Sequence, residues 1–312
     1  MKFRALGSTG LSVSEIGMGC WAIGGDQFGN SYGPTDDDVS LAAIRKAVDM
    51  GVAFFDTADV YGHGHSEELL GKALANVRDR VFIATKVGYD FYQKRGKVFD
   101  EEYVRFALEQ SLKRLGTNYI DLYQMHNPSL AEAQSENVCA VFRELKKEGL
   151  IRHWGISIHD PKEGVIAIKT TKPETIQVAY NIFNQSAAQE LFAVAKENGV
   201  GIIAREPLAN GFLSGKYDET STFQPGDVRN DAIAKDTIVT YVRMARRVHE
   251  LLNERKETLA QLALKFVLQH DAVSVAIPGA KTPEQAEENA MASDVMPLQT
   301  GELARLRGLY AA

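Results

Sequence analysis

Hydrophobic residues in this chain cluster in short, continuous runs rather than alternating with polar ones. Eight runs, rich in β-branched and aromatic side chains, each predict a strand: residues 15–21, 52–58, 80–88, 119–126, 151–157, 174–181, 200–207 and 272–279. Continuous apolar character is typical of strands buried on both faces, as in a parallel sheet covered by helices. The pattern therefore predicts a layered α/β protein.

Segments of helical periodicity lie between the predicted strands. Residues 101–116 follow Asp100, carry acids in their first turn and end at Gly116, as capping and the helix dipole favour. Residues 135–149 repeat this design, with basic residues near the end. Further helix starts are marked by Thr35 before three aspartates, by Asp160-Pro161 with Glu163, and by Ser186 with Gln189.

A strand and a helix repeated eight times predict a (β/α)8 barrel, or TIM barrel, that forms a single domain over residues 1–312. Two stretches interrupt the repeat. Residues 2–14 predict an N-terminal β-hairpin that plugs one barrel mouth. Residues 208–271 are too long for one repeat and predict a polar loop and two extra helices, at about 237–253 and 257–270.

Composition and charge narrow the class of protein. Hydrophobic residues make up 45% and charged residues 24%, the balance of a globular protein, and the formal net charge is -6. No segment concentrates Lys and Arg without acids, so we expect no nucleic-acid partner. No run of about 18 apolar residues and no apolar core of a signal peptide occurs, which predicts a cytoplasmic protein without membrane contact. Cys20 and Cys139 lack metal-ligand or redox spacing and are expected to be reduced.

Polar residues recur where the predicted strands end. In a (β/α)8 barrel, the carboxyl ends of the strands form the functional face. The residues at that position are Asp56, Lys86, His126, Ser157, Gln177 with Asn181, and Arg205. Each alone is compatible with a structural role, such as an N-cap or a hydrogen-bonded core histidine. Because a buried Lys and a buried Asp are each costly without a partner, their convergence predicts a site.

Four of these positions suggest acid–base chemistry. Asp56 and Lys86 come from successive strands and are expected to form an ion pair, and Tyr61 follows Asp56 in a glycine-rich loop that is able to fold back over Lys86. A phenol has an ordinary pKa of about 10, and a neighbouring cation lowers that value. His126, one strand further, is then placed to hydrogen-bond a substrate oxygen or to pass a proton to Tyr61. The set predicts catalysis with Tyr61 as general acid.

The loop GHGHSEE at residues 62–68 also suggests two other sites, and the sequence disfavours both. It lacks the third glycine and the first βαβ context of a dinucleotide-binding turn. His63 and His65 have no further ligand residues in a suitable pattern, so no metal site is expected.

The motifs resemble those of the aldo-keto reductases, (β/α)8 enzymes that use NADPH to reduce carbonyl compounds to alcohols. The matching segments run through most of the chain: GMGCWAIGG (17–25), FFDTADVYGHGHSEELLGKAL (54–74), IATKVG (83–88), DLYQMHNPS (121–129), IRHWGIS (151–157), IQVAYN (176–181) and IPGAKTPEQAEEN (277–289). The family's catalytic tetrad falls on Asp56, Tyr61, Lys86 and His126. The resemblance implies hydride transfer from NADPH to a small carbonyl substrate.

By the same resemblance, Ser157 and Gln177 hold the nicotinamide carboxamide and Trp21 walls the substrate pocket. The other residues implied to bind NADPH are Arg205, Pro207, Leu208, Gly279, Lys281, Gln285, Glu288 and Asn289. The residues themselves support a phosphate site in this region. Thr282 as N-cap, with a capping box closed by Gln285, predicts a helix N-terminus beside Lys281, which suits the 2′-phosphate of NADPH.

Four positions depart from the family pattern. One is Gln285, where many relatives carry arginine, so Lys281 is expected to carry most of the NADP preference. Ile158 stands where many relatives have an asparagine, and Arg205 stands where many have an aromatic residue under the nicotinamide. A guanidinium plane is also able to stack on a ring. Glu206 puts a carboxylate near the expected diphosphate, which requires Lys216 or Arg229 to offset it.

Two other functions stay open from the sequence. Lys86 on a barrel strand is a candidate nucleophile of a Schiff-base aldolase or lyase, although Asp56 would keep its amine protonated. A non-catalytic NADP-binding regulator, like the channel-associated members of the same family, would share the motifs. The sequence indicates neither the substrate nor the oligomeric state.

Overall fold

Eight parallel strands form the central sheet of the protein. A computed structural model describes residues 1–29 and 31–311, with side chains through residue 309. The strands are β3 (Met18–Gly19), β4 (Phe54–Asp56), β5 (Phe82–Val87), β8 (Ile120–His126), β9 (Ile151–Ser157), β10 (Thr175–Ala179), β11 (Gly201–Arg205) and β12 (Val273–Ala276). Each lies within one of the eight predicted runs, so the strand prediction is confirmed.

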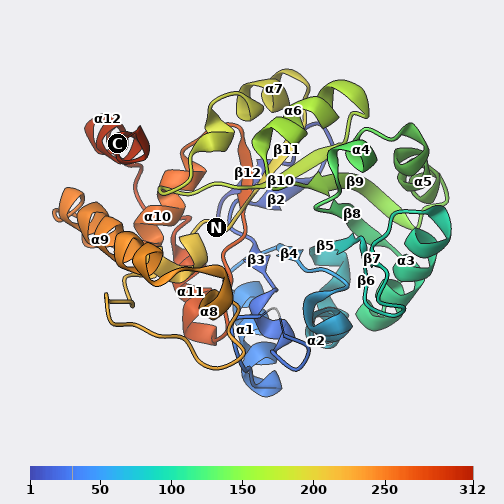
Figure 1. Cartoon of the computed structure of the whole chain (residues 1–312), viewed down its shortest axis with the longest axis horizontal. Helices are drawn as coiled ribbons and strands as arrows, with labels where there is room; N and C mark the ends of the chain where they lie inside the picture. Colours follow the sequence, from blue (N-terminus) through green and yellow to red (C-terminus); the bar gives the residue numbers. More distant parts are fainter. Residues whose placement is uncertain (30, 312) are drawn as a thin grey trace.

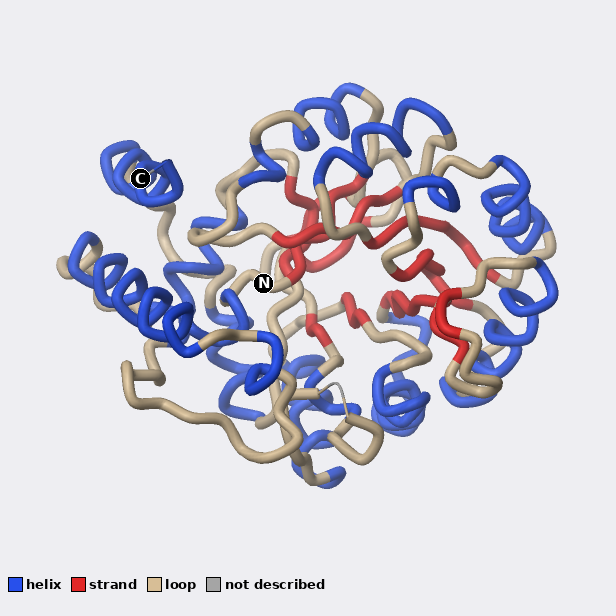
Figure 2. The backbone as a smooth tube through the Cα atoms, in the orientation of Figure 1, coloured by secondary structure: helices blue, strands red, loops and turns tan. Residues whose placement is uncertain are grey.

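The sheet closes on itself. Its strand order is β12-β11-β10-β9-β8-β5-β4-β3, and parallel bridges from Ile16 to Ala276 and from Gly19 to Gly279 join its first and last strands. Figure 2 shows the strands as an inner ring with helices outside it. This is the (β/α)8 barrel that the repeat predicted.

Helices cover the outside of the barrel (Figure 1). They are α1 (Asp37–Asp49), α2 (His65–Leu74), α3 (Glu101–Leu115), α4 (Leu130–Ala133), α5 (Glu136–Lys147), α6 (Pro161–Thr170), α7 (Leu191–Glu197), α8 (Arg229–Ala232), α9 (Lys235–Leu251), α10 (Leu259–Leu268), α11 (Pro283–Met291) and α12 (Thr300–Ala311). Short 3-10 turns are η1 (Ala22–Gly24), η2 (Tyr61–Gly64), η3 (Ala75–Arg80), η4 (Ser186–Ala188) and η5 (Ala209–Ser214). A small hairpin of β6 (Tyr89–Asp90) and β7 (Gly96–Lys97) follows β5.

The N-terminal hairpin closes the mouth at the start of the strands, as predicted. Strands β1 (Phe3–Ala5) and β2 (Ser12–Ser14) pair antiparallel. Leu6 and Val13 are fully buried and belong to the same apolar cluster as inward residues of β4, β8 and β12. Gly7 has a positive φ of 56°, and a Cβ there would overlap the backbone of Gly201 at the start of β11. The opposite mouth, at the carboxyl ends of the strands, is left for a site.

Most predicted helix ends are confirmed. Asp100 accepts a hydrogen bond from Tyr103 N at the start of α3, and Gly116 ends that helix in the left-handed region. Asp160 and Glu163 form the expected capping box of α6. The two extra helices exist as α9 and α10, each with ends within two residues of the prediction.

Two predicted helix starts are wrong. Asp36, not Thr35, caps α1, because the Asp36 carboxylate accepts from Val39 N. Ser186 begins only the 3-10 turn η4, and the α-helix starts later, at Leu191. The Ser186 hydroxyl donates to Asn184 Oδ1 at 2.7 Å, so it satisfies the preceding turn rather than a helix N-terminus.

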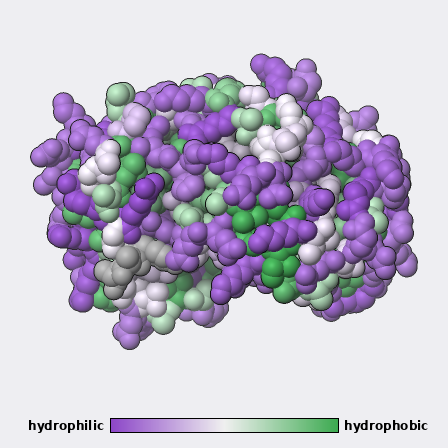
Figure 3. Space-filling model, turned by 90° about the horizontal axis from the view of Figure 1, so that it is seen from above, coloured by the Kyte–Doolittle hydropathy of each residue, from purple (hydrophilic) through white to green (hydrophobic). Residues whose placement is uncertain are grey.

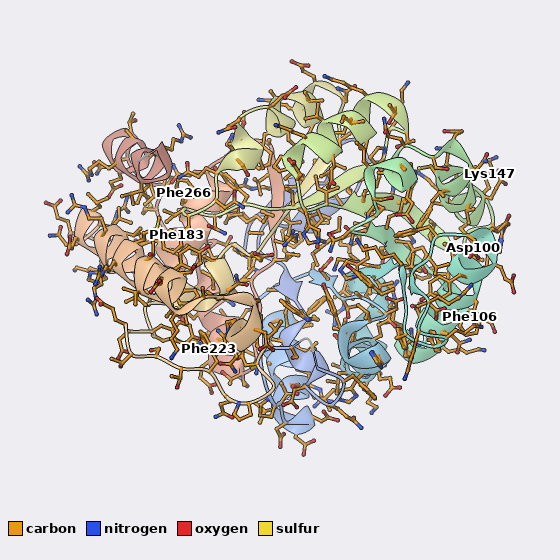
Figure 4. All side chains as sticks on the ribbon, viewed as in Figure 1. Asp100, Phe106, Lys147, Phe183, Phe223 and Phe266 are labelled. Carbon is orange, nitrogen blue, oxygen red and sulfur yellow. The ribbon has the colours of Figure 1, made fainter. Side chains whose placement is uncertain are left out.

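The insertion after β11 packs against the barrel through its own apolar cluster. Phe212, Ile238 and Val242 are buried together, and Phe183 and Phe223, both labelled in Figure 4, pack against them. The face seen in Figure 3 is largely hydrophilic. Among residues 1–29 and 31–311, no helix combines the length and the apolar character needed to cross a bilayer.

Candidate active site

A carboxylate, an ammonium and a phenol meet at the carboxyl ends of β4 and β5. The side chain of Lys86 is fully buried, and its Nζ donates to Asp56 Oδ1 at 2.5 Å and to Tyr61 Oη at 3.2 Å. A third bond, to the carbonyl oxygen of Thr57 at 2.9 Å, uses the remaining proton of the ammonium. The expected ion pair and the expected contact with the phenol are both present.

The loop after β4 folds back so that Tyr61 lies over Lys86 of β5. Tyr61 N donates to the carbonyl oxygen of Ala58 at 3.1 Å, which tightens the turn. Gly62 has a φ of 59°, and a Cβ there would overlap the backbone of Gly24 in η1. The glycine lets the loop pack against η1 and sets the phenol over Lys86.

Burial and charge act in opposite directions on these groups. Burial raises the pKa of Tyr61, while Lys86 opposes it, and the net pKa lies above the ordinary value. The prediction that the cation lowers this pKa therefore describes only part of the effect. Burial lowers the pKa of Lys86, but Asp56 and Tyr61 outweigh it, so the net shift is upward. A protonated ammonium is a poor nucleophile, which argues against a Schiff-base role.

His126, at the end of β8, faces the same group. Its ring lies 5.7 Å from the ring of Tyr61 and 5.1 Å from that of Tyr89, edge-on in both cases. Its Nδ1 is buried without a hydrogen-bond partner among the described residues. Burial, helped by Lys86 and Arg205, holds its pKa well below the ordinary range, so the imidazole is neutral.

A cavity of about 490 Å³ opens above these residues. Twelve of the predicted site residues line it: Trp21, Asp56, Tyr61, His126, Ser157, Gln177, Arg205, Pro207, Leu208, Gly279, Lys281 and Gln285. Lys86 lies directly behind Asp56 and Tyr61. Asn289 is buried and donates to Gly279 O at 3.2 Å, so it supports the wall from behind, and Glu288 does not line the cavity.

Two buried glutamines hold the second oxygen of Asp56. Gln177 Nε2 donates to Asp56 Oδ2 at 2.7 Å, and Gln124 Nε2 donates to the same atom at 3.2 Å. Gln124 was missed in the sequence, although a polar residue within an apolar strand, two positions before His126, was a usable signal. Asn181, noted just after β10, instead organises a turn by accepting from the backbone of Phe183.

Arg205 enters the cavity from the end of β11. Its Nη1 forms an ion pair with Glu206, and its Nη2 donates to Ile158 O at 3.1 Å and contacts His159 Nδ1 at 3.4 Å. The expectation that Lys216 or Arg229 offsets Glu206 is wrong. Arg205 is the partner of Glu206, and Arg229 pairs with Asp227 at 2.5 Å because that carboxylate matches its guanidinium in two bonds.

The start of α11 is capped, but not by the predicted box. Thr282 Oγ1 accepts from Gln285 N at 3.4 Å, as expected. Gln285 Oε1 accepts from Lys281 N at 2.8 Å rather than from Thr282 N, because the side chain reaches one residue further back. Lys281 Nζ crosses to the loop before α1 and donates to the carbonyl oxygen of Tyr32. A helix N-terminus and a lysine therefore stand at one end of the cavity.

The family model described as "Aldo/keto reductase family" matches residues 15–311. The chain belongs to this family. Among curated relatives, Aldo-keto reductase YhdN of Bacillus subtilis is 34% identical over 300 residues, covering 92% of this chain and 87% of the relative. L-glyceraldehyde 3-phosphate reductase of Escherichia coli is 30% identical over 325 residues, covering 98% and 91%.

Solved structures agree with this assignment. The holo form of aldo-keto reductase AKR11C1 from Bacillus halodurans superposes with a TM-score of 0.82 at 31% identity, covering 99% of this chain and 96% of that one. An aldo-keto reductase from Klebsiella pneumoniae in complex with NADPH gives a TM-score of 0.77 at 27% identity, covering 99% and 95%.

Several residues of this aldo/keto reductase line the cavity without having been predicted. Asn127 follows His126 with a positive φ of 51°, and its Oδ1 accepts from Ser157 Oγ at 3.2 Å. Tyr32 packs on Trp21 with ring centroids 4.7 Å apart. Both residues follow the ends of regular elements, where no periodic pattern marks a functional position.

His63 in η2 and His65 at the start of α2 take surface roles. His63 stacks between Phe28 and Phe91, with centroid distances of 4.3 Å and 4.6 Å. His65 pairs with Asp37 at 2.8 Å. Within the part of the chain that the structure describes, no three His, Cys, Asp or Glu side chains are grouped to hold a metal ion.

Proposed function

We propose that this protein reduces aldehydes or ketones to alcohols with NADPH and that Tyr61 is the proton donor. One observation carries the proposal: at the wall of the cavity, Lys86 Nζ lies 2.5 Å from Asp56 Oδ1 and 3.2 Å from Tyr61 Oη. A buried phenol held by an ammonium is suited to give up a proton to a developing alkoxide. Two curated relatives carry names of carbonyl reductions, L-glyceraldehyde 3-phosphate reductase and NADH-specific methylglyoxal reductase, both from Escherichia coli.

The residues of the cavity fit a nicotinamide cofactor. The N-terminus of α11 with Lys281 offers the positive end of a helix dipole and a cation to a phosphate. The buried Nε of Arg205 has no partner among the described residues and requires an acceptor. Ser157 and Gln177 would hold the carboxamide, and NADPH when bound supplies the hydride. The NADPH complex of the Klebsiella pneumoniae neighbour supports this cofactor.

The residues of the chain would then divide the chemistry as follows. Tyr61 donates its proton to the carbonyl oxygen as the carbon receives the hydride, and the resulting phenolate is stabilised by Lys86 until it takes a proton from water. Neutral His126, 5.7 Å from Tyr61, orients the carbonyl oxygen. Trp21, whose ring lies 6.2 Å from Tyr61, covers the reacting group.

A screen of NADPH oxidation over aldehydes, ketones and sugars tests this function. We expect turnover of reactive aldehydes by the wild type and a loss of about 100-fold or more in the Tyr61→Phe variant, because general acid catalysis is removed. NADPH binding without turnover of any carbonyl would instead favour a non-catalytic regulator. A rice relative, 30% identical over 323 residues, is named as a probable voltage-gated potassium channel subunit beta, which favours testing that alternative.

A further inference from the structure

Arg205 is a cation of the cavity wall whose side chain is fixed by contacts on several sides. Its Nη1 is held by Glu206 and its Nη2 by Ile158 O and His159, while its side chain is only 18% exposed. Glu206 itself is held at a φ of 53°, in the left-handed region that a glutamate rarely adopts. The guanidinium therefore has little freedom to move away from a bound ligand.

Arg205 lies close to Tyr61 and to the residue after Ser157, and Tyr61 and Ser157 are the two residues expected to flank the nicotinamide ring. Its Nη2 bonds to the residue directly after Ser157, and its charge acts on Tyr61 and Asp56. This inference rests on the proposed function, in which Ser157 holds the nicotinamide carboxamide and Tyr61 faces the carbon that receives the hydride. A ring held between these two residues would have Arg205 as a neighbour.

Reduced and oxidised nicotinamide differ in charge. The ring of NADPH is neutral, whereas that of NADP+ carries a positive charge. The guanidinium of Arg205 remains charged at all working pH values, and a partly buried site screens charge poorly. An aromatic residue in this place would attract the positive ring, but a guanidinium repels it.

We propose that Arg205 makes the site discriminate between the two redox states of its cofactor, favouring NADPH over NADP+. Glu206, paired with Arg205, reduces this repulsion and sets its size. Weak binding of the oxidised form also speeds its departure after each turnover. The discrimination is a property of binding, and it is independent of which carbonyl compound is reduced.

The experiment measures dissociation constants for NADPH and NADP+ by titration calorimetry, with no substrate present. Phosphate and adenosine contacts are the same in both ligands, so the ratio of the two constants isolates the effect of ring charge. We expect Arg205→Met to lower the ratio Kd(NADP+)/Kd(NADPH) about tenfold, which corresponds to about 1.4 kcal/mol. Arg205→Lys keeps the charge and should retain most of the ratio, and Glu206→Gln should raise it.

The possible results distinguish a failure of the Arg205 proposal from a failure of the proposed NADPH-dependent function. If Arg205→Met leaves the ratio Kd(NADP+)/Kd(NADPH) unchanged, because it weakens both ligands equally or neither, the inference is overturned and the proposed function stands. The same holds if Arg205→Lys changes the ratio as much as Arg205→Met does. If the wild type binds neither cofactor, the proposed function falls and this inference with it. A ratio that rises in Glu206→Gln supports the charge argument even if Arg205→Met is unstable.

Discussion

Gln177 Nε2 donates to Asp56 Oδ2 at 2.7 Å and lies 3.3 Å from Gln124 Oε1. The residue expected to hold the nicotinamide carboxamide therefore also holds the carboxylate that pairs with Lys86. A glutamine amide has two protons and a carbonyl oxygen, so Gln177 is able to keep its bonds to Asp56 and Gln124 and still offer an acceptor to a ligand. Cofactor binding and the orientation of Asp56 are linked through this one side chain.

Gln124→Leu and Gln177→Leu should separate these two roles. Loss of a hydrogen bond to a charged group costs about 1.5–3 kcal/mol, so we expect kcat to fall by about tenfold or more in both variants. Because Gln124 bonds to Asp56 and Gln177 but does not line the cavity, its variant should change the Kd for NADPH much less than Gln177→Leu does. Steady-state kinetics and cofactor titration measure the two effects.

A suitable control is Gln185→Leu. Gln185 is also a buried amide, but its Nε2 bonds to the carbonyl oxygens of Ile182 and Leu306, and none of these residues lines the cavity. Its variant should lower the free energy of unfolding and leave kcat unchanged. Equal kcat losses in Gln124→Leu and Gln185→Leu would show that Gln124 acts only through general stability.

The barrel and the ends of its strands could be predicted because they depend on local patterns. Continuous apolar runs identified the eight strands, and the barrel geometry then placed Asp56, Lys86 and His126 on one face. The contact between Lys86 and Tyr61 followed from that placement together with a glycine in the loop. These features need only periodicity and strand order.

Hydrogen-bond partners could not be predicted in the same way where several donors or acceptors compete in the folded structure. Lys281 donates to a carbonyl at residue 32, and Gln285 accepts from Lys281 N instead of closing a capping box. Each group has several acceptors or donors within reach, and the balance depends on distances that the sequence does not contain. The same reason explains why the pairing of Glu206 with Arg205 was missed.

The reductive reaction should be nearly independent of pH between about 6 and 9. The pKa of Tyr61 is raised by burial above its ordinary value of 10.0, so the phenol remains protonated and able to act as an acid across this range. The pKa of His126 is held well below 6.5, so the imidazole remains neutral throughout. Measured kcat/KM for aldehyde reduction should therefore be flat. A titration with its midpoint inside this window would contradict the protonation state assigned to Tyr61 or to His126.

Lys281→Met should reduce the preference for NADPH over NADH. The ammonium stands beside the N-terminus of α11, where the 2′-phosphate is expected, and a charge-assisted hydrogen bond there is worth about 1.5–3 kcal/mol. The Kd for NADPH should rise by about 10- to 100-fold, while the Kd for NADH, which lacks this phosphate, should change little. Equal weakening of both would indicate that Lys281 acts only by holding the loop at Tyr32.

A buried carboxyl next to the site should lower stability at neutral pH. Asp59 is fully buried, and neither of its carboxyl oxygens has a hydrogen-bond partner among the described residues. Glu67, close by, already pairs with Arg114 at 2.7 Å. Burial, and then the charge of Glu67, raise the pKa of Asp59 well above 3.8, so the native state holds a proton that the unfolded chain releases.

Asp59→Asn should therefore stabilise the protein, and increasingly so as the pH rises. Below about pH 4, the unfolded value, both states of the wild type are protonated and the variant gains little. Above it, the unfolded chain binds fewer protons than the native one, so wild-type stability falls with pH until Asp59 ionises in the fold. The neutral amide avoids this cost, and we expect a gain of about 1 kcal/mol or more at pH 7, roughly 2 °C in Tm.

Calorimetric Tm values at pH 5 and pH 8 measure it, and a Tm difference that shrinks as pH rises would show that Asp59 is ionised in the native protein. Glu67→Gln serves as the contrasting variant, because it breaks a formed pair with Arg114 and should lower Tm at both pH values.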